Sequence, residues 1–206
     1  MSEAVVPQAV VFDVGRVLYR WELRHLFAKL IADEAELDWF LANVVTPEWH
    51  FAHDRGVPLA EMVPARQAEF PDHAHLIEAY RRRFNETIPG PVEGSLDLVR
   101  RLHEADVPLY ALTNFGSEFW AAFRPTAPIF DLFTEIVVSG DERVAKPDSA
   151  IYAILEERSG LSGKALFFAD DVPANVAAAR RRGWQAEVFT DAATLEAQLQ
   201  GRGVLP

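Results

Sequence analysis

Five short apolar runs constrain the fold of this chain more than any other feature of its sequence. They are AVVF (9–12), PLYAL (108–112), EIVVS (135–139), ALFFA (165–169) and AEVF (186–189). Nearly continuous hydrophobicity over so few residues is typical of a strand that is buried on both faces, because a strand with one solvent-facing side alternates apolar and polar residues. The runs therefore predict a sheet with both faces covered.

The stretches between the later runs are predicted to be helices. Residues 92–106, 149–160 and 173–183 carry helical periodicity or helix-end signals. The last of them starts with Pro173 and stops at Gly183, which is the usual order of these two residue types in a helix. Strands that alternate with helices favour a parallel sheet. The predicted fold class is α/β, with a doubly wound, Rossmann-like parallel sheet.

The first run is separated from the second by a long segment that is itself predicted to be helical. Residues 20–88 contain four helix-like stretches and no strand-like run, and PGP at 89–91 ends the segment. An insertion of this length can cover the carboxyl edge of the sheet. We expect an α/β core domain made of residues 1–19 and 89–206, and a helical cap domain made of residues 20–88.

Composition narrows the range of partners. The 206 residues carry a formal net charge of −11, which disfavours binding to nucleic acid or to an anionic membrane surface. The chain has no cysteine, so disulfides and thiolate metal sites are excluded. The first residues lack a signal-peptide pattern, and no apolar run approaches the roughly 18 residues of a membrane-spanning helix. We expect a cytoplasmic protein; its oligomeric state is not encoded in any feature of the sequence that we identified.

Polar residues stand where four of the predicted strands end. Asp13 follows the first run, Thr113 and Asn114 follow the second, Lys146 comes after the third, and the pair 170–171, both aspartates, follows the fourth. Ligands of open α/β sheets bind beyond the carboxyl ends of the strands. We therefore expect these side chains to meet at one edge of the sheet.

The residue types at this edge suit one kind of chemistry. Converging carboxylates repel one another unless a cation or proton intervenes, and oxygen ligands suit magnesium. A hydroxyl, an amide and a lysine are donors that suit phosphoryl oxygens. A carboxylate held beside a metal and such donors is a candidate nucleophile for phosphoryl transfer, and Asp13 occupies that position.

Four motifs make the chain resemble the haloacid dehalogenase-like (HAD) hydrolase superfamily. They are VVFDVG (10–15), ALTN (111–114), VAKPD (144–148) and FFADDVPAN (167–175), and they occur in the family's order. The insertion after the first motif resembles the helical cap of subfamily I. The nearest likeness is to sugar-phosphate phosphatases whose first motif also carries a glycine two residues after the nucleophile.

The resemblance implies catalytic and substrate-binding roles. Asp13 would be the nucleophile that attacks phosphorus. Thr113 would donate a hydrogen bond to the transferring phosphoryl group, with help from Asn114, and Lys146 would neutralise charge on the nucleophile and the phosphate. Arg16, next to the catalytic turn, would either contact substrate or form a salt bridge.

The resemblance also implies a site for Mg²⁺. Its ligands would include Asp13, the backbone carbonyl of Gly15 and Asp171. Asp170 would orient Lys146 or a metal-bound water, and Asn175 would support the structure of this turn.

Gly15 departs from the pattern of most phosphatases in this superfamily, which carry an aspartate there to protonate the leaving alcohol and later activate water. Such general acid–base assistance is typically worth about 10²–10⁴-fold in rate. Three consequences are open. The leaving group needs little protonation, a cap residue substitutes, or activity is feeble. The nearest candidate substitutes are Glu22, His50, His53 and Asp54.

The leading functional hypothesis is a Mg²⁺-dependent phosphatase that acts on a small phosphorylated metabolite, with sugar phosphates as one candidate class. A 2-haloacid dehalogenase is the second hypothesis, since those enzymes also lack the second aspartate. Their first motif, however, carries an aromatic residue, a glycine and a threonine, and their last motif lacks adjacent aspartates, unlike this chain. The third hypothesis is a catalytically weak protein that binds a metabolite or another protein.

Overall fold

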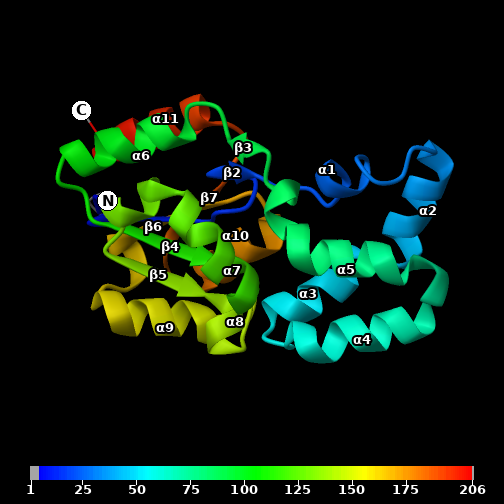
Figure 1. The fold of residues 1–206 in the computed structure, drawn as a ribbon. Helices are drawn as coiled ribbons and strands as arrows, with labels where there is room; N and C mark the ends of the chain where they lie inside the picture. Colours follow the sequence, from blue (N-terminus) through cyan, green and yellow to red (C-terminus); the bar gives the residue numbers. More distant parts are fainter. Residues whose placement is uncertain (1–4, 206) are drawn as a thin grey trace.

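A computed structural model describes residues 5–205 and contains a five-stranded sheet whose paired strands are all parallel, in the order β5-β4-β1-β6-β7. The strands are β1 (Ala9–Phe12), β4 (Leu109–Thr113), β5 (Glu135–Val138), β6 (Leu166–Asp170) and β7 (Gln185–Val188). This arrangement confirms the predicted α/β fold with a Rossmann-like parallel sheet (Figure 1).

The strand ends differ from the predicted ones by about one residue, which matters for the site. Thr113 and Asp170 are the last residues of β4 and β6 rather than the residues that follow these strands. β1 is the central strand, and Phe12 pairs with both Ala111 and Ala169. Asp13 therefore emerges between the two neighbouring strands that carry the other polar groups.

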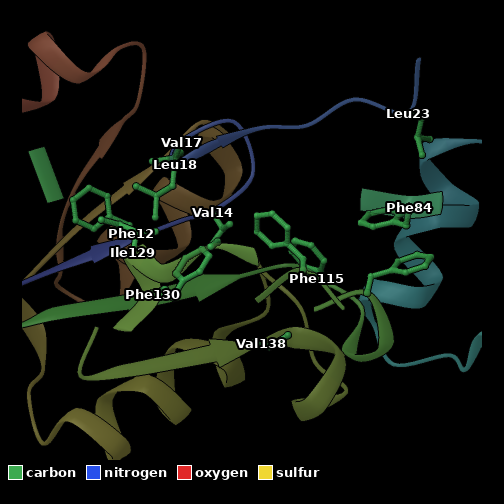
Figure 2. Close-up of a cluster of buried hydrophobic side chains, with 14 of the residues drawn as sticks. Phe12, Val14, Val17, Leu18, Leu23, Phe84, Phe115, Ile129, Phe130 and Val138 are labelled. Atoms are coloured by element: carbon green, nitrogen blue, oxygen red, sulfur yellow. The ribbon is translucent and has the colours of Figure 1, made fainter. Parts of the chain in front are cut away.

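Each face of the sheet is covered by a pair of helices, and the side chains of β1 alternate between the two faces. Val10 and Phe12 belong to a buried cluster with residues of α6 (Ser95–Glu104) and α11 (Ala192–Gly201), part of which is drawn in Figure 2. Ala9 and Val11 belong to a second cluster with residues of α9 (Ser149–Ser159) and α10 (Pro173–Arg181). Burial on both faces explains why the strands are apolar at nearly every position.

Five α-helices lie between β2 and β3, in the part of the chain that is predicted to be inserted (Figure 1). They are α1 (Arg24–Phe27), α2 (Glu34–Asn43), α3 (Pro47–Asp54), α4 (Leu59–Glu69) and α5 (Ala74–Arg83). We call residues 20–88 the helical insertion. Its two ends lie together, because β2 (Tyr19–Arg20) pairs with β3 (Gly90–Pro91) in an antiparallel ribbon. The division into a core and a cap domain remains a prediction.

The remaining helices are short. Two of them, α7 (Ser117–Phe123) and α8 (Ser139–Glu142), follow β4 and β5 at the carboxyl edge of the sheet. The 3-10 turns are η1 (Pro71–His73), η2 (Phe84–Thr87), η3 (Arg124–Thr126), η4 (Pro128–Leu132) and η5 (Gly163–Ala165). None of the helices within residues 5–205 has the length and apolar character needed to cross a bilayer.

One continuous apolar cluster joins the sheet to the helical insertion. It extends from Phe12 in β1 to Phe84 in η2, and the Phe84 ring lies edge-on to Phe115 with 5.8 Å between centroids (Figure 2). Phe84 also stacks on Phe119 of α7 at 3.8 Å. These contacts hold the insertion against the edge of the sheet from which Asp13 emerges.

Candidate active site

A buried ammonium group joins three of the strand ends. The Nζ of Lys146 lies 2.8 Å from Oδ1 of Asp13, and it donates hydrogen bonds to Oδ2 of Asp170 and to the carbonyl oxygen of Leu112, both at 2.7 Å. Only 1% of Lys146 is exposed, so solvent does not screen these interactions. The predicted meeting of Asp13, Lys146 and Asp170 at one edge of the sheet is what the structure shows.

Asn114 fixes the backbone on which Lys146 stands. Its Oδ1 accepts a hydrogen bond from the backbone N–H of Lys146 at 2.8 Å, and its Nδ2 donates to the backbone carbonyl of the same residue at 3.0 Å. The Asn114 side chain also lines the cavity above Asp13. Its two hydrogen bonds to the backbone at Lys146 are a positioning contact that the sequence did not reveal.

Asp170 is held by three residues. Both of its carboxylate oxygens accept from Nδ2 of Asn175 at 3.0 Å, Oδ1 also accepts from the backbone N–H of Val172 at 2.8 Å, and Oδ2 accepts from Lys146. The support predicted for Asn175 is therefore directed at this carboxylate. Because both carboxylate oxygens of Asp170 already accept hydrogen bonds, Asp170 is better placed to orient Lys146 than to bind a metal directly.

Asp171 has fewer partners. Its Oδ2 lies 3.9 Å from Nη1 of Arg16, whose side chain is more than half exposed. Burial raises the pKa of Asp171, and the neighbouring Asp170 raises it further, while Arg16 opposes the shift. Arg16 also lies over the Trp21 ring, 5.4 Å from its centroid, and it borders the cavity, so the predicted salt bridge is present and contact with substrate remains a prediction.

The carboxylates of Asp13, Asp170 and Asp171 each offer an oxygen, and these oxygens lie within 4.8 Å of one another. Three carboxylates around one ammonium leave an excess of negative charge, which a divalent cation would neutralise. A set of hard oxygen ligands, partly buried and at close spacing, suits Mg²⁺. Gly15 lines the same cavity, and a Cβ on it would meet no atom within 4 Å.

The nucleophile candidate is itself strongly perturbed. Burial raises the pKa of Asp13 to about 7, with Lys146 acting against the shift and Asp170 adding to it. For Lys146, burial lowers the pKa, but the two adjacent carboxylates outweigh burial and raise it on balance. The ammonium form of Lys146 is therefore secure at neutral pH.

Thr113 has a hydroxyl without a partner. The residue is almost completely buried, and its Oγ1 finds no hydrogen bond among the described residues. An orphaned buried hydroxyl costs free energy, so such a group is more often used by a ligand than left idle. Thr113 lies at the end of β4 but is not among the residues that line the cavity.

A cavity opens above the Asp13 carboxylate, between the sheet and the helical insertion. The sheet edge contributes Asp13, Gly15 and Lys146, and the insertion contributes His50 and Asp54. The rest of its wall is largely apolar: Val14, Tyr19, Trp21, Phe84, Ile88, Phe115, Phe123 and Val172. Apart from Trp21, the sequence did not single out these wall residues, because an aromatic side chain in a helical segment looks the same whether it packs in a core or lines a pocket.

The structure separates the four predicted substitutes for a missing acid. His50 and Asp54 line the cavity. Glu22 is exposed and lies outside the cavity wall, and the His53 ring packs edge-on against Phe119, 4.7 Å between centroids.

A family model described as haloacid dehalogenase-like hydrolase matches residues 7–183, and the chain belongs to this family of hydrolases. The resemblance seen in the four motifs is thereby confirmed, while the assignment to a subfamily remains a prediction. No match was found among curated proteins.

Solved structures share the fold at low sequence identity. A predicted HAD-like family hydrolase from Porphyromonas gingivalis is 16% identical, with a TM-score of 0.74 over 95% of this chain and 99% of that one. A HAD family enzyme from Bacteroides thetaiotaomicron, in complex with magnesium and inorganic phosphate, is 20% identical, with a TM-score of 0.68 over 90% and 95%. The L-2-haloacid dehalogenase from Xanthobacter autotrophicus is 18% identical, with a TM-score of 0.59 over 97% and 85%.

Proposed function

We propose that this hydrolase is a Mg²⁺-dependent phosphatase that acts on a small phosphorylated metabolite through an aspartyl-phosphate intermediate on Asp13. The observation that carries the proposal is the buried ammonium of Lys146 between Asp13 and Asp170, with a third carboxylate, Asp171, beside them. A cluster of carboxylates suits a divalent cation, and phosphoryl transfer uses such a cation. Carbon–halogen cleavage does not require one.

The two oxygens of Asp13 are not equivalent. Oδ1 accepts from the backbone N–H of Val14 at 2.7 Å and faces Lys146 at 2.8 Å. Oδ2 is the oxygen left to attack phosphorus in line with the leaving oxygen. In the first step the Oδ2–phosphorus bond forms and the bond to the leaving oxygen breaks; in the second, water attacks phosphorus and frees Asp13.

The other polar residues at this edge of the sheet neutralise charge, bind the phosphoryl group or hold the metal ion. Lys146 neutralises charge on Asp13 and on the phosphoryl group, Thr113 donates its free hydroxyl to a phosphoryl oxygen, and Asn114 positions Lys146. Asp13, Asp171 and the carbonyl of Gly15 would hold Mg²⁺, with Asp170 behind them. The ion would supply electrostatic stabilisation of the phosphoryl oxygens.

The residues of the cavity wall indicate which kind of leaving group the substrate has. Trp21, Phe84 and Phe115 line the cavity as apolar side chains, and Arg16 is a cation in the same lining. A leaving group with an apolar face fits this wall, and sugar phosphates remain one candidate class because sugar rings have such a face. The magnesium and phosphate complex of the Bacteroides thetaiotaomicron relative supports this direction.

The test is phosphate release from a panel of sugar, alkyl and aryl phosphates, with and without Mg²⁺. We expect EDTA-sensitive release that is lost in Asp13→Asn. The matched control is Asp97→Asn, since Asp97 is an exposed aspartate of α6 whose carboxylate pairs only with Arg100 among the ion pairs of the described residues. Phosphate release that survives in Asp13→Asn would overturn the mechanism.

The same proteins distinguish the other two hypotheses. Chloride release from 2-haloacids that is insensitive to EDTA would identify a dehalogenase and contradict the proposal. Negligible turnover of every substrate, together with tight and saturable binding of a metabolite or a protein, would identify a binding protein instead.

A further inference from the structure

The proposed reaction needs a group that gives a proton to the leaving oxygen and later takes one from water. The titratable side chains that line the cavity are those of Asp13, Arg16, Tyr19, His50, Asp54, Lys146 and Asp171. Asp13 is the proposed nucleophile, Asp171 the proposed metal ligand, and Lys146 is engaged by two carboxylates. Asp54 is the one carboxyl group of this lining that has no assigned role.

Asp54 is the last residue of α3, and its carboxyl group is poorly satisfied. The residue is 5% exposed, and its Oδ2 lies 3.5 Å from Nε2 of His50. Its Oδ1 has no hydrogen-bond partner among the described residues. A buried carboxyl oxygen without a partner in the wall of a cavity is available to a ligand.

His50 is held in one orientation beside this carboxyl. Its ring stacks on the ring of Trp21, with 4.9 Å between centroids, and on the ring of Phe84, with 5.5 Å between centroids. Its Nδ1 lies 2.7 Å from the hydroxyl of Tyr80. Because burial raises the pKa of Tyr80 well above its usual range, the hydroxyl keeps its proton and can donate it to Nδ1. That arrangement leaves the proton of neutral His50 on Nε2, facing Asp54.

The backbone of Asp54 is tied to the sheet although the residue belongs to the helical insertion. The hydroxyl of Ser139, directly after β5, donates to the carbonyl oxygen of Asp54 at 2.5 Å. The same hydroxyl accepts from the backbone N–H of Phe115 at 3.0 Å. Asp54 is therefore fixed relative to the strand ends that carry Asp13 and Lys146, which a proton donor for this site requires.

The surroundings of Asp54 shift its pKa to a range in which both its protonated and its ionised form are accessible near neutral pH. Burial raises its pKa to about 7, while His53, the backbone of Gly116 and the charge of Lys146 lower it. His50 is less suited to the role, because burial lowers its pKa to about 3 and keeps it neutral. A general acid–base group works best when its pKa lies near the working pH.

We propose that the Asp54 carboxyl group is the general acid and base of this hydrolase, in place of the carboxylate that Gly15 lacks, a role that rests on the proposed phosphatase function. In the first step Asp54 gives its proton to the leaving oxygen as the phosphorus–oxygen bond breaks, so the alcohol departs neutral and Asp54 becomes a carboxylate. In the second step this carboxylate takes a proton from the attacking water, the bond between phosphorus and Asp13 breaks, and Asp54 is again protonated when phosphate leaves.

The first experiment compares wild type with Asp54→Asn, using p-nitrophenyl phosphate and the best alkyl phosphate of the panel, both with Mg²⁺. Nitrophenolate leaves without an acid, but hydrolysis of the intermediate still needs a base. We expect a burst of about one nitrophenolate per enzyme, then steady turnover about 10²–10⁴-fold slower than wild type. Acid-quenched protein should carry one added phosphoryl group. Alkyl phosphate should give no burst.

The matched control is Glu48→Gln, an exposed carboxyl on the same helix. We expect its turnover to equal that of wild type. If Asp54→Asn is unfolded by circular dichroism, Asp54→Ser takes its place with the same expected burst.

The second experiment adds a carboxylate at the position that lacks one. A Cβ at Gly15 meets no atom within 4 Å, and its φ is not in the left-handed region, so a side chain can be accepted there. Gly15→Asp in the Asp54→Asn background should raise steady turnover at least tenfold over Asp54→Asn alone. Gly15→Asn in the same background should not.

The outcomes separate the two proposals. Wild type that releases no phosphate, or that keeps its activity in Asp13→Asn, overturns the proposed function. A Mg²⁺-dependent, Asp13-dependent phosphatase whose Asp54→Asn variant turns over within threefold of wild type, without phosphoenzyme, overturns only the role of Asp54. Equal rescue by Gly15→Asp and Gly15→Asn also overturns it, because the effect would then be independent of a carboxylate.

Discussion

Thr113 and Thr87 show how two buried threonines differ in what their hydroxyls do. Both residues are nearly inaccessible. The hydroxyl of Thr87 donates to the carbonyl of Phe84 at 2.7 Å, whereas that of Thr113 has no partner among the described residues. A buried hydroxyl without a partner, at the end of the strand next to β1, is expected to serve the substrate.

Replacing each threonine by valine tests this difference. Thr113→Val should leave the free energy of unfolding unchanged or raise it by about 1 kcal/mol, because it removes an unsatisfied polar atom. Its kcat/KM for phosphate release should fall at least tenfold. Thr87→Val should instead lose about 1 kcal/mol of stability. Urea unfolding measures the free energy of unfolding of each variant, and steady-state kinetics measure its kcat/KM. A large loss of stability in Thr113→Val would contradict a role of this hydroxyl in substrate binding.

Lys146 should be essential to stability as well as to activity. Lys146→Met leaves Asp13 and Asp170 adjacent and without a cation, which should cost about 3–5 kcal/mol at pH 8 in EDTA. Lys146 holds down the raised pKa of Asp13, so the pKa of Asp13 should be higher in the variant than in wild type. The native variant then binds a proton that native wild type releases near pH 7, so the loss of stability relative to wild type should be larger at pH 8 than at pH 5.

The control for this prediction is Lys29→Met, which removes an exposed lysine paired with Glu86. That change should cost about 1 kcal/mol or less, with little dependence on pH. Chemical unfolding at pH 5, 6, 7 and 8 gives the comparison. A loss in Lys146→Met that is equal at all four pH values would contradict the proposed origin of the effect.

At the scale of elements, the position of α3 decides whether the helical insertion can take part in chemistry. The helix begins at Pro47, capped by the Thr46 hydroxyl, and its last residue, Asp54, is bound through Ser139 to the loop after β4. Phe84 also stacks on Phe119 of α7, and Nδ2 of Asn85 donates to the carbonyl oxygen of Ala122 in the same helix at 3.2 Å. The Ser139 hydroxyl donates the hydrogen bond that holds the backbone of Asp54 itself.

Ser139→Ala removes this link. Two hydrogen bonds are lost, and we expect a loss of about 1–3 kcal/mol in stability because the buried partners stay behind. If α3 carries the acid and base, kcat/KM, which reports formation of the phosphoenzyme, should fall more for alkyl phosphates than for p-nitrophenyl phosphate, since only the alkyl leaving group needs a proton in that step. Ser117→Ala in α7 is the control. Equal losses with both substrates would point to a structural effect alone.

At the scale of the whole molecule, we expect the excess of carboxylates at the sheet edge to couple the free energy of unfolding to the binding of Mg²⁺. A ligand that binds only the native state stabilises it by mass action. At a Mg²⁺ concentration about a hundredfold above the dissociation constant, Tm should rise by about 5–10 °C, and EDTA should reverse the rise. Asp171→Asn should abolish most of this shift without removing the Lys146 interactions. A shift of the same size in Asp171→Asn would contradict the assigned ligand.

Much of the candidate site was predictable because parallel strands present their carboxyl ends at one edge. Asp13, Lys146 and Asp170 could be placed together from the apolar runs before them, with errors of about one residue in the strand bounds, while Thr113 ends β4 without lining the cavity. Such errors did not matter, since a residue at the end of a buried strand reaches the edge in either case.

The sequence by itself determined the α/β fold, the family and the cluster of Asp13, Lys146 and Asp170, because periodicity and local spacing decide which residues end a buried strand or follow it closely. Only the tertiary structure decided that Asp54 lines the same cavity, with His50 held by Tyr80. His50 and Tyr80 are separated by 30 residues and lie on different helices. Contacts of that kind depend on how helices pack, and the sequence pattern of a single segment does not predict the segment against which it packs.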